Sequence, residues 1–293
     1  MELRPPTRAD AEYIVAMLLA CDIVDVGWPD YDLDGLLNEW NEPGVVDLAK
    51  DGFLAEGVYG LVLGEMGRGW VHPDLRGRGL GAQLAEKLEN RARERGLTHI
   101  KQQIGRYDHT GMELLRSRGY YESNRFIDFR LPDSAVAGLP AAGDVRAYDP
   151  ARDAQPMQEL LERTVTVAGR RVIPLEIVLQ SAPDLHLWRV FDAPGGGLHG
   201  AVRAELRPAG FISGAITLIG VDKDARGRGI GQALVGSVSR VLLARGATEI
   251  RITLRADQTD AVNLFENLGF AGENYIVEFR LDLDGAPDPA ARP

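Results

Sequence analysis

The sequence predicts an α+β protein of two tandem domains, each with a mixed, twisted sheet flanked by helices. A block of the chain recurs at a constant interval of 150 residues, and a length of 293 residues suits two domains better than one. Within each copy, short apolar runs typical of strands surround segments with helical periodicity.

The repeat is clearest where VHPDLRGRGLGAQL (71–84) recurs as VDKDARGRGIGQAL (221–234). Aligning 71–131 with 221–281 without a gap gives 18 identities at 61 positions. Chance similarity between two glycine-rich helix starts is the alternative, but chance would not keep one frame across five elements. We therefore predict a duplicated domain.

The predicted boundaries follow the repeat: a first domain at 1–131, a linker at 132–143, a second domain at 144–283 and a tail at 284–293. The linker sequence PDSAVAGLPAAG consists mainly of small residues, contains proline and glycine, and shows no periodicity.

Each domain is expected to open with a strand and a helix. Thr7 and Asp10 resemble a capping box before the first helix, and Asp149-Pro150 places a cap and an N1 proline before its counterpart. The strands expected before the repeated block are 53–56, 58–63 and 69–72, then 185–191, 200–206 and 211–221. A glycine loop, a helix ending near Gly96 or Gly246, a strand, a helix and a closing strand complete each copy.

Composition excludes several classes of protein. The formal net charge of -10 argues against a nucleic-acid partner, and no run reaches the ~18 apolar residues of a membrane span. The single cysteine, Cys21, allows no intrachain disulfide and fits a reducing compartment. We expect a cytoplasmic protein, a monomer or a homodimer, with no metal site.

The repeated glycine loops carry the candidate chemistry. Arg76–Gly81 and Arg226–Gly231 each lie between a strand and a helix start, where glycines bring backbone N–H groups close to an anion. Two arginines in each loop add charge-assisted hydrogen bonds, so a diphosphate is the expected ligand. The loop is neither a Walker loop nor a Rossmann fingerprint, because no Gly-Lys-Ser/Thr follows and the glycine spacing is G-x-G-x-G.

This pattern, with a valine before the loop and a leucine after it, resembles the acetyl-CoA loop of the GNAT N-acetyltransferase superfamily. The stretch AVNLFENLGF (261–270) is similar to the second motif of that family. The resemblance covers most of both halves. It implies an acetyltransferase that uses acetyl-CoA, the coenzyme held by its diphosphate on the loop and by its pantetheine arm along a splayed strand, with a backbone N–H near Val221 facing the thioester carbonyl.

The residues that the resemblance assigns to the coenzyme are Ile219, Val221, Arg226, Gly227, Arg228, Gly229, Ile230, Gly231 and Gln258 in the second copy, and Val71, Arg76, Gly77, Arg78, Gly79, Leu80 and Gly81 in the first.

The sequence departs from the family at the proton donor. The tyrosine that often protonates the departing thiolate falls at Phe265 and Leu115, and the asparagine of the second motif is replaced by Gln258 and Asp108. A thiol leaves as thiolate at a cost of about 2 kcal/mol at pH 7, whereas deprotonating an alkylammonium acceptor costs about 4.6 kcal/mol. A general base therefore matters more than a general acid.

Glu205 and Asp222 are the candidate general bases of the second copy, with Glu65 and His72 as their rough counterparts in the first. The alternative for each is an ordinary solvated or strand-edge residue. We favour the second copy as catalytic and the first as a degenerate binding or scaffolding copy, because the second has the longer apolar strand and the better second motif. Tandem relatives such as the mycothiol synthases are similar in layout, with an active C-terminal copy.

The segment after the first helix usually walls the acceptor site in this family. In the first half it is acidic and aromatic, with Asp22, Asp25, Trp28, Asp30, Tyr31, Asp32 and Asp34; in the second it carries Arg163, Arg170 and Arg171. These segments would attract a cationic amine and an anionic acceptor respectively, unless they are merely solvated loops. We expect acetyl transfer to a small amine; a non-catalytic acetyl-CoA sensor or scaffold and a protein or peptide acetyltransferase stay open.

Overall fold

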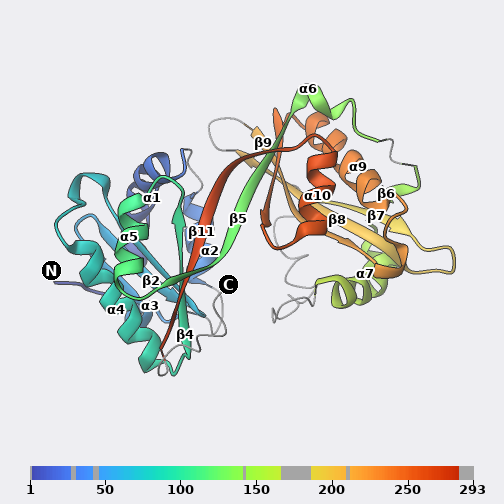
Figure 1. Ribbon diagram of the computed structural model, residues 1–293. Helices are drawn as coiled ribbons and strands as arrows, with labels where there is room; N and C mark the ends of the chain where they lie inside the picture. The colour runs from blue at the N-terminus through green and yellow to red at the C-terminus, as the bar shows by residue number, and fades with distance from the viewer. Residues whose placement is uncertain are drawn as a thin grey trace. The chain divides into compact units, whose positions relative to one another are not determined.

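A computed structural model describes residues 2–27, 31–41, 46–140, 143–165, 186–208 and 212–283. The chain forms two compact units, which we call the first unit (Met1–Phe126 with Asn274–Pro293) and the second unit (Ile127–Glu273). Figure 1 follows the chain through both of them. None of the described helices is long and apolar enough to cross a membrane.

The first unit has its strands in the order β1-β2-β3-β4-β11. On β2, Tyr59 and Leu61 pack under α1 and α2, whereas Val58 and Val62 face α4 and α5, as the two-residue period of a strand requires. Its elements are η1 (Arg8–Asp10), α1 (Ala11–Asp25), α2 (Leu33–Trp40), α3 (Leu48–Asp51), β1 (Gly52–Ala55), β2 (Val58–Leu63), β3 (Met66–Val71), η2 (Pro73–Leu75), α4 (Leu80–Glu94), β4 (His99–Gly105), α5 (His109–Ser117), the start of β5 (Tyr121–Pro132) and most of β11 (Ala271–Asp282).

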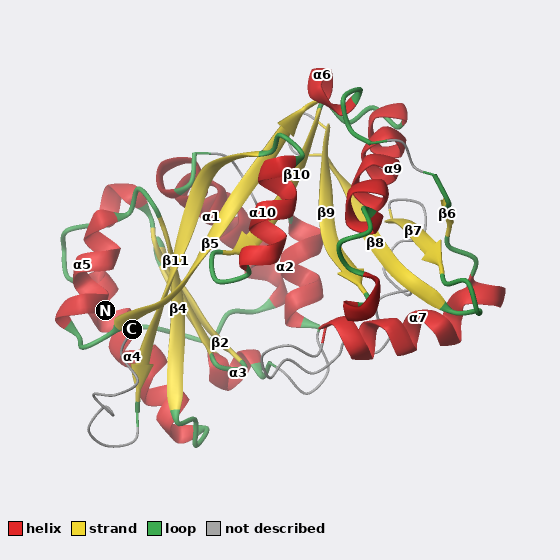
Figure 2. Cartoon of the chain, turned by 45° about the vertical axis from the view of Figure 1, so that its right-hand side comes forward, coloured by secondary structure: helices red, strands yellow, loops and turns green. Residues whose placement is uncertain are grey.

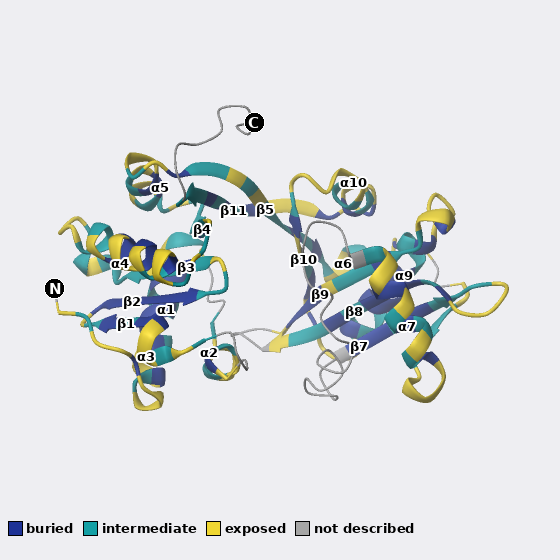
Figure 3. Cartoon of the chain, turned by 90° about the horizontal axis from the view of Figure 1, so that it is seen from below, coloured by how far each residue is buried: buried dark blue, intermediate teal, exposed yellow. Residues whose placement is uncertain are grey.

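The second unit has its strands in the order β5-β10-β9-β8-β7-β6. Helices α7 and α9 cover opposite faces of β8, because Ala201 packs in the cluster under α7 and Val202 in the one under α9 (Figure 2). Its further elements are α6 (Asp133–Val136), β6 (Val145–Ala147), α7 (Pro150–Val165), β7 (His186–Asp192), β8 (Leu198–Pro208), β9 (Ile212–Val221), η3 (Lys223–Ala225), α9 (Ile230–Ala244), β10 (Glu249–Arg255) and α10 (Thr259–Asn267). Figure 3 shows that the central strands are largely buried while the outer sides of the helices are exposed.

The duplication is confirmed element by element. Helices α4 and α9, strands β4 and β10, helices α5 and α10, and strands β5 and β11 each begin and end 150 residues apart. The constant interval predicted from the sequence therefore holds for the backbone as well.

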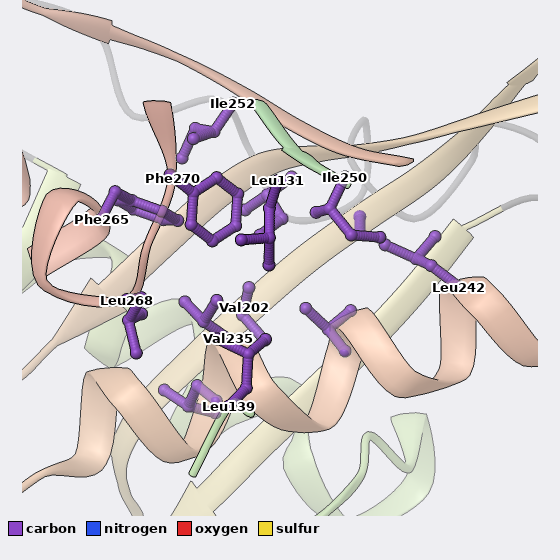
Figure 4. Close-up of a cluster of buried hydrophobic side chains, with 14 of the residues drawn as sticks. Leu131, Leu139, Val202, Val235, Leu242, Ile250, Ile252, Phe265, Leu268 and Phe270 are labelled. Carbon is purple, nitrogen blue, oxygen red and sulfur yellow. The ribbon is translucent and has the colours of Figure 1, made fainter. Parts of the chain in front are cut away.

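The final strands are exchanged between the copies. Strand β11, from the second copy, pairs antiparallel with β4 of the first unit, from Ile276 opposite Gly105 to Asp282 opposite His99. Phe279 is fully buried in the core of the first unit, and its repeat counterpart Phe129 lies in the core of the second. Figure 4 shows Leu131, from β5, among side chains of the second unit. The predicted boundaries follow the repeat, whereas the compact units cut across it.

Three elements differ from their prediction. The opening strand of the first half is a single bridge between Arg4 and Leu54, while β6 opens the second. Strand β3 starts at Met66, earlier than predicted, and includes two glycines. At Gly67 the absence of a side chain lets the core pack against the backbone, because a Cβ there would lie 2.6 Å from Ile100 Cδ1. The expected linker contains α6, and its Val136 and Leu139 are buried against the second unit.

The start of the second unit is held by one arginine between two carboxylates. Arg146 donates to both oxygens of Asp153, at 2.6 and 2.7 Å, and to both oxygens of Asp192, at 2.7 and 2.9 Å. These hydrogen bonds hold the pKa of Asp153 and the pKa of Asp192 below their usual range. Because the folded pKa values are depressed, the stabilisation is complete well above pH 4 and is lost as the pH falls through the folded values.

We expect acid to weaken the fold through this arginine. The free energy of unfolding should fall as the pH is lowered from about 5 to about 2, since the side chain of Asp153 is 2% exposed and accepts two charged hydrogen bonds from Arg146. Asp153→Asn should be less stable at pH 7 and show a shallower pH dependence in denaturant titrations. Asp257→Asn, at a carboxylate that is 58% exposed, is the control; an unchanged slope in Asp153→Asn would contradict the assignment.

Candidate functional site

The two glycine loops have the same conformation. Each follows a short 3-10 turn, and the two glycines of each loop have positive φ: 74° at Gly77 and Gly227, 77° at Gly79 and Gly229. Gly79 and Gly229 are the N-cap residues of α4 and α9. The first N–H groups of a helix have no intrahelical acceptor, so each loop presents donors and the positive end of a helix to one place. Helix starts with this geometry bind anions in other proteins, and the anion site stays a prediction here.

The glycines of each loop differ in how much space surrounds them, and this difference indicates different roles. A Cβ on Gly77, Gly79 or Gly227 would meet nothing within 4 Å, so these positions are open on the side that a ligand would approach. A Cβ on Gly81 or Gly231 would lie 3.1 Å from a leucine of the next helix, Leu114 or Leu264. The last glycine of each loop thus serves the packing of the helix start, a reason that the sequence did not reveal.

The strand before each loop separates from its parallel neighbour. Strand β9 pairs with β10 only from Ser213 to Ala215, and β3 pairs with β4 only at Met66 opposite Lys101. The later residues of β9, Ile219 and Val221 among them, lack this ladder and are partly exposed. We call the stretch without this pairing, from the middle of the strand to the glycine loop, the opening; Val71 lies at the corresponding place in the first copy.

The two copies differ at this opening, because only β9 carries a bulge. Against β8, Arg203 faces Leu218 and Ala204 faces Ile216, so Thr217 is an extra residue and is exposed. The pairing of β2 with β3 runs without a shift from Val58 opposite Val71 to Leu63 opposite Met66. A bulge leaves ladder groups unpaired and turns the strand. Near Val221, by contrast, the N–H of Asp222 is engaged, donating to His199 O at 2.8 Å.

Comparisons with known proteins decide the family. The sequence model of the acetyltransferase (GNAT) family matches residues 18–124 and, separately, residues 158–270. The chain belongs to the GNAT acetyltransferase family. The mycothiol acetyltransferase of Saccharopolyspora erythraea is 27% identical over 241 residues, covering 71% of this chain and 74% of that protein. The mycothiol acetyltransferase of Saccharomonospora viridis is 27% identical over 305 residues, covering 90% of this chain and 92% of that protein. Such relatives support an N-acetyltransferase enzyme.

Solved structures agree on the fold. A GCN5-related N-acetyltransferase from Sphaerobacter thermophilus superposes with a TM-score of 0.78 at 24% identity, covering 99% of this chain and 98% of that one. A tandem GNAT protein from the clavulanic acid biosynthesis pathway gives a TM-score of 0.73 at 16% identity, covering 98% and 99%. Both alignments cover nearly the whole of each chain.

The two candidate bases of this GNAT protein lie at different levels of β9. Glu205 is opposite Ala215, close to the bulge, with Arg207 Nε at 2.8 Å and Arg203 Nη2 at 3.7 Å from its carboxylate. Asp222 follows the strand, where Arg163 Nη2 lies 3.2 Å from its carboxylate and the N–H of Asp224 donates to it. Seven residues separate the two levels, or roughly 23 Å at about 3.3 Å per residue. One reacting group cannot reach both.

The counterparts in the first copy have structural partners. Glu65 lies in the turn between β2 and β3, 3.1 Å from His99 Nε2 and 3.6 Å from Lys101 Nζ. His72 follows β3, and its Nδ1 accepts from the N–H of Asp74 at 3.3 Å. These contacts agree with the plainer interpretation left open for both residues.

The family's proton donor has no replacement at its own position. Phe265 is fully buried and makes an edge-to-face contact with Phe270 at 5.0 Å between ring centroids, and Leu115 is 2% exposed (Figure 4). Gln258 and Asp108 are the N-cap residues of α10 and α5. Asp108 accepts from the N–H of Gly111 at 2.8 Å, whereas the side chain of Gln258 makes no capping bond.

Several described residues of the acidic segment in the first copy are engaged in contacts within the protein. Asp25 is paired with Arg76, and Asp32 caps α2 by accepting from the N–H of Gly35 at 2.6 Å. Tyr31 packs edge to face on Trp70, at 5.8 Å, and accepts a hydrogen bond from Arg68. Asp22 is buried and Asp34 is exposed. Trp28, Asp30, Arg170 and Arg171 lie outside the described residues.

Proposed function

We propose that the protein is an acetyl-CoA-dependent N-acetyltransferase for a small amine, and that the second unit carries the reaction. One observation carries the choice of unit: the bulge at Thr217 opens β9 on the way to the loop 226–231, and β3 has no equivalent. Family membership and the named relatives support the reaction class.

In this proposal the second glycine loop binds the diphosphate of the coenzyme. The backbone of Gly227 and Gly229 and the positive end of α9 face the anion, and Arg226 and Arg228 add charge. The pantetheine arm runs from the loop along Ile219 and Val221 toward the bulge. The coenzyme supplies the acetyl group as a thioester.

The bulge is the proposed place for the thioester carbonyl. Backbone groups at Thr217 are freed from the ladder, and a fixed N–H donor to a developing oxyanion contributes about 3 kcal/mol in other enzymes. This shifts the donor from the vicinity of Val221, which the family resemblance implied, to the middle of the strand. The N–H of Asp222, beside Val221, already has His199 O as its acceptor.

Glu205 is the proposed general base because its level on β8 is that of the bulge. The Glu205 carboxylate takes one proton from the acceptor ammonium, directly or through a water. The neutral amine nitrogen then forms the new bond to the acetyl carbon as the carbon–sulfur bond breaks, and the second proton of the nitrogen passes to solvent water. The thiolate then leaves without a protein acid, which costs about 2 kcal/mol at pH 7 and suits the buried Phe265.

A thiol-release assay tests the proposed activity. The purified protein, acetyl-CoA and a panel of small amines, desacetyl mycothiol included because of the named relatives, should release coenzyme A faster with at least one amine than without protein. Release with no amine better than background favours the non-catalytic sensor. Acetylated peptides in mass spectrometry, without small-molecule turnover, favour a peptide acetyltransferase.

Glu205→Gln should lower kcat roughly tenfold at pH 7, at the low end for a positioned base because two arginines already compete for its oxygens. The deficit should shrink as the pH rises toward the amine pKa of about 10.4, where the acceptor loses its proton without help. The measurement is kcat as a function of pH. Asp222→Asn is the matched variant; a larger loss there than in Glu205→Gln would move the base to the loop end of β9.

A further inference from the structure

The first unit has the same kind of opening as the second, and the end of helix α1 lies in it; the chain that follows α7 in the second unit lies outside the described residues. Strands β3 and β4 separate after Met66, and the last turn of α1 reaches the end of β3. The thiol of Cys21 lies 3.5 Å from Val71 O, and the guanidinium of Arg76 makes a two-point ion pair with Asp25 at 2.6 and 2.8 Å. The turn therefore holds one side of the opening, at the strand end and at the first residue of the loop.

The same turn is bonded to the other side of the opening. Asp25 O accepts from the N–H of Tyr107, just beyond β4, at 3.3 Å. A Cβ on Gly105 would lie 2.5 Å from Asp25 O, so this position admits only glycine while α1 stays in place. Asn274 of β11, 5% exposed, donates to Val26 O at 3.0 Å. Backbone and side-chain bonds thus connect the end of α1 to β3, β4 and β11.

The ion pair between Arg76 and Asp25 also neutralises one positive charge of the first loop. The side chain of Arg76 is 23% exposed and that of its partner Asp25 is 16% exposed, whereas Arg226 is 50% exposed. Among the described residues, the contacts of Arg226 are Val221 O at 3.3 Å and the carboxylate of Asp260 at 3.6 Å, and Asp260 is 91% exposed. Among the described residues, Arg76 of the first loop is therefore neutralised by a close two-point ion pair, whereas Arg226 of the second loop has only a longer contact with an exposed carboxylate.

We infer that the end of α1 closes the coenzyme opening of the first unit, so that each chain binds one acetyl-CoA, at the second unit. The inference rests on the proposed coenzyme site of the second unit. A pantetheine arm along β3 would have to displace Cys21, Asp25 and Val26 together, breaking the ion pair with Arg76 and the bonds to Tyr107 and Asn274. These hydrogen bonds and the ion pair hold the end of α1 in the place that a pantetheine arm would take in the first unit.

Calorimetry with acetyl-CoA on the full chain counts the sites. One equivalent is expected, abolished in Gly229→Asp and kept in Gly79→Asp. Two equivalents in the unmodified protein, or loss of a site in Gly79→Asp, would overturn the inference. Absence of any binding would instead remove the proposed coenzyme site of the second unit, and the closure is then decided by a second measurement.

Cys21 is the only cysteine in the sequence and is fully buried in the closing turn, so its reactivity reports on the turn directly. Burial also raises the pKa of this thiol to about 11, which keeps it unreactive while the turn is closed. Its rate of modification by a small thiol reagent should change less than about twofold when acetyl-CoA is added to Gly229→Asp, whose second loop is blocked.

Opening the ion pair provides the positive control for this reporter. Asp25→Ala should raise the modification rate at least about tenfold, since it removes two charge-assisted hydrogen bonds, while Glu86→Gln on the exposed side of α4 should not. A rate that acetyl-CoA itself raises tenfold in Gly229→Asp would show that the coenzyme enters the first unit and would refute the closure, even if Asp25→Ala fails to fold.

Discussion

Aspartate in place of Gly229 is expected to lower kcat/KM for acetyl-CoA at least about a hundredfold while the fold is kept. Gly229 has a φ of 77° and caps α9, and a Cβ there would meet no atom closer than 3.9 Å. Aspartate tolerates this left-handed conformation better than most residues, so strain is small. Its carboxylate would lie where the helix end and the loop amides are proposed to bind the diphosphate.

The magnitude follows from electrostatics. Two like charges about 4 Å apart repel by roughly 4 kcal/mol at the effective dielectric constant near a protein surface, and about 2.8 kcal/mol already corresponds to a hundredfold loss. The loss should appear mainly in KM for acetyl-CoA, because the charge opposes binding before any chemistry. Steady-state thiol release gives both constants, and thermal unfolding checks that the variant is folded.

Two matched variants separate the effect of the charge from that of the side-chain size, and the role of the second loop from that of the first. Gly229→Asn has the same size and tolerance for positive φ but no charge, so it should lose less than about tenfold. Gly79→Asp places the same charge in the same conformation on the first loop, where φ is also 77°. It should change kcat/KM less than about twofold if the first unit is closed. Activity lost in Gly79→Asp and kept in Gly229→Asp would assign catalysis to the first unit.

The glycine loops were predictable because their information is local. The positive φ values, the helix start and the donors all come from six consecutive residues, and the repeat provides the same pattern twice. The helix and strand limits of the repeated block followed for the same reason. Residue types and spacing along one short segment were enough to predict a glycine loop at the start of a helix.

The features that distinguish the copies were not predictable, because they depend on contacts between distant segments. Asp25 and Arg76 are 51 residues apart in the sequence, and nothing in the acidic run around Asp25 marks it as an ion-pair partner rather than an acceptor-binding residue. The bulge at Thr217 is a property of the register between β8 and β9. The sequence of one strand does not define its register with a neighbouring strand when the strands on both sides of it are apolar.

The exchange of the final strands could not be predicted, because the two strands carry the same residues at key positions. The triplets Phe129-Arg130-Leu131 and Phe279-Arg280-Leu281 are identical, so the sequence cannot say which triplet closes which sheet. Both strands begin right after the helix of their own copy, and sequential elements are usually neighbours in space. That rule assigns β11 to the second unit, whereas the structure pairs most of it with β4.

Phe279→Ala tests the exchange and is expected to destabilise the first unit by about 3 to 5 kcal/mol, although the residue belongs to the second repeat. Its ring is fully buried against the first-unit core that includes Leu88, Ile100 and Leu115. Amide hydrogen exchange should accordingly lose protection in β2, β3 and β4 first. Phe129→Ala is the mirror-image variant, with the same side chain 2% exposed in the core of the second unit, and should expose β8, β9 and β10.

The pair of variants is decisive because sequence and structure predict opposite patterns. If each final strand packed with its own repeat, Phe279→Ala would reduce protection in β8 to β10 and Phe129→Ala in β2 to β4, and the exchange would be wrong. If the exchange is correct, each unit needs a strand encoded by the other copy. Neither repeat, cut at 131 or started at 144, would then contain its own complete sheet, and the strands that form the proposed coenzyme opening of the second unit would depend on residues 127–132 for their outer neighbour.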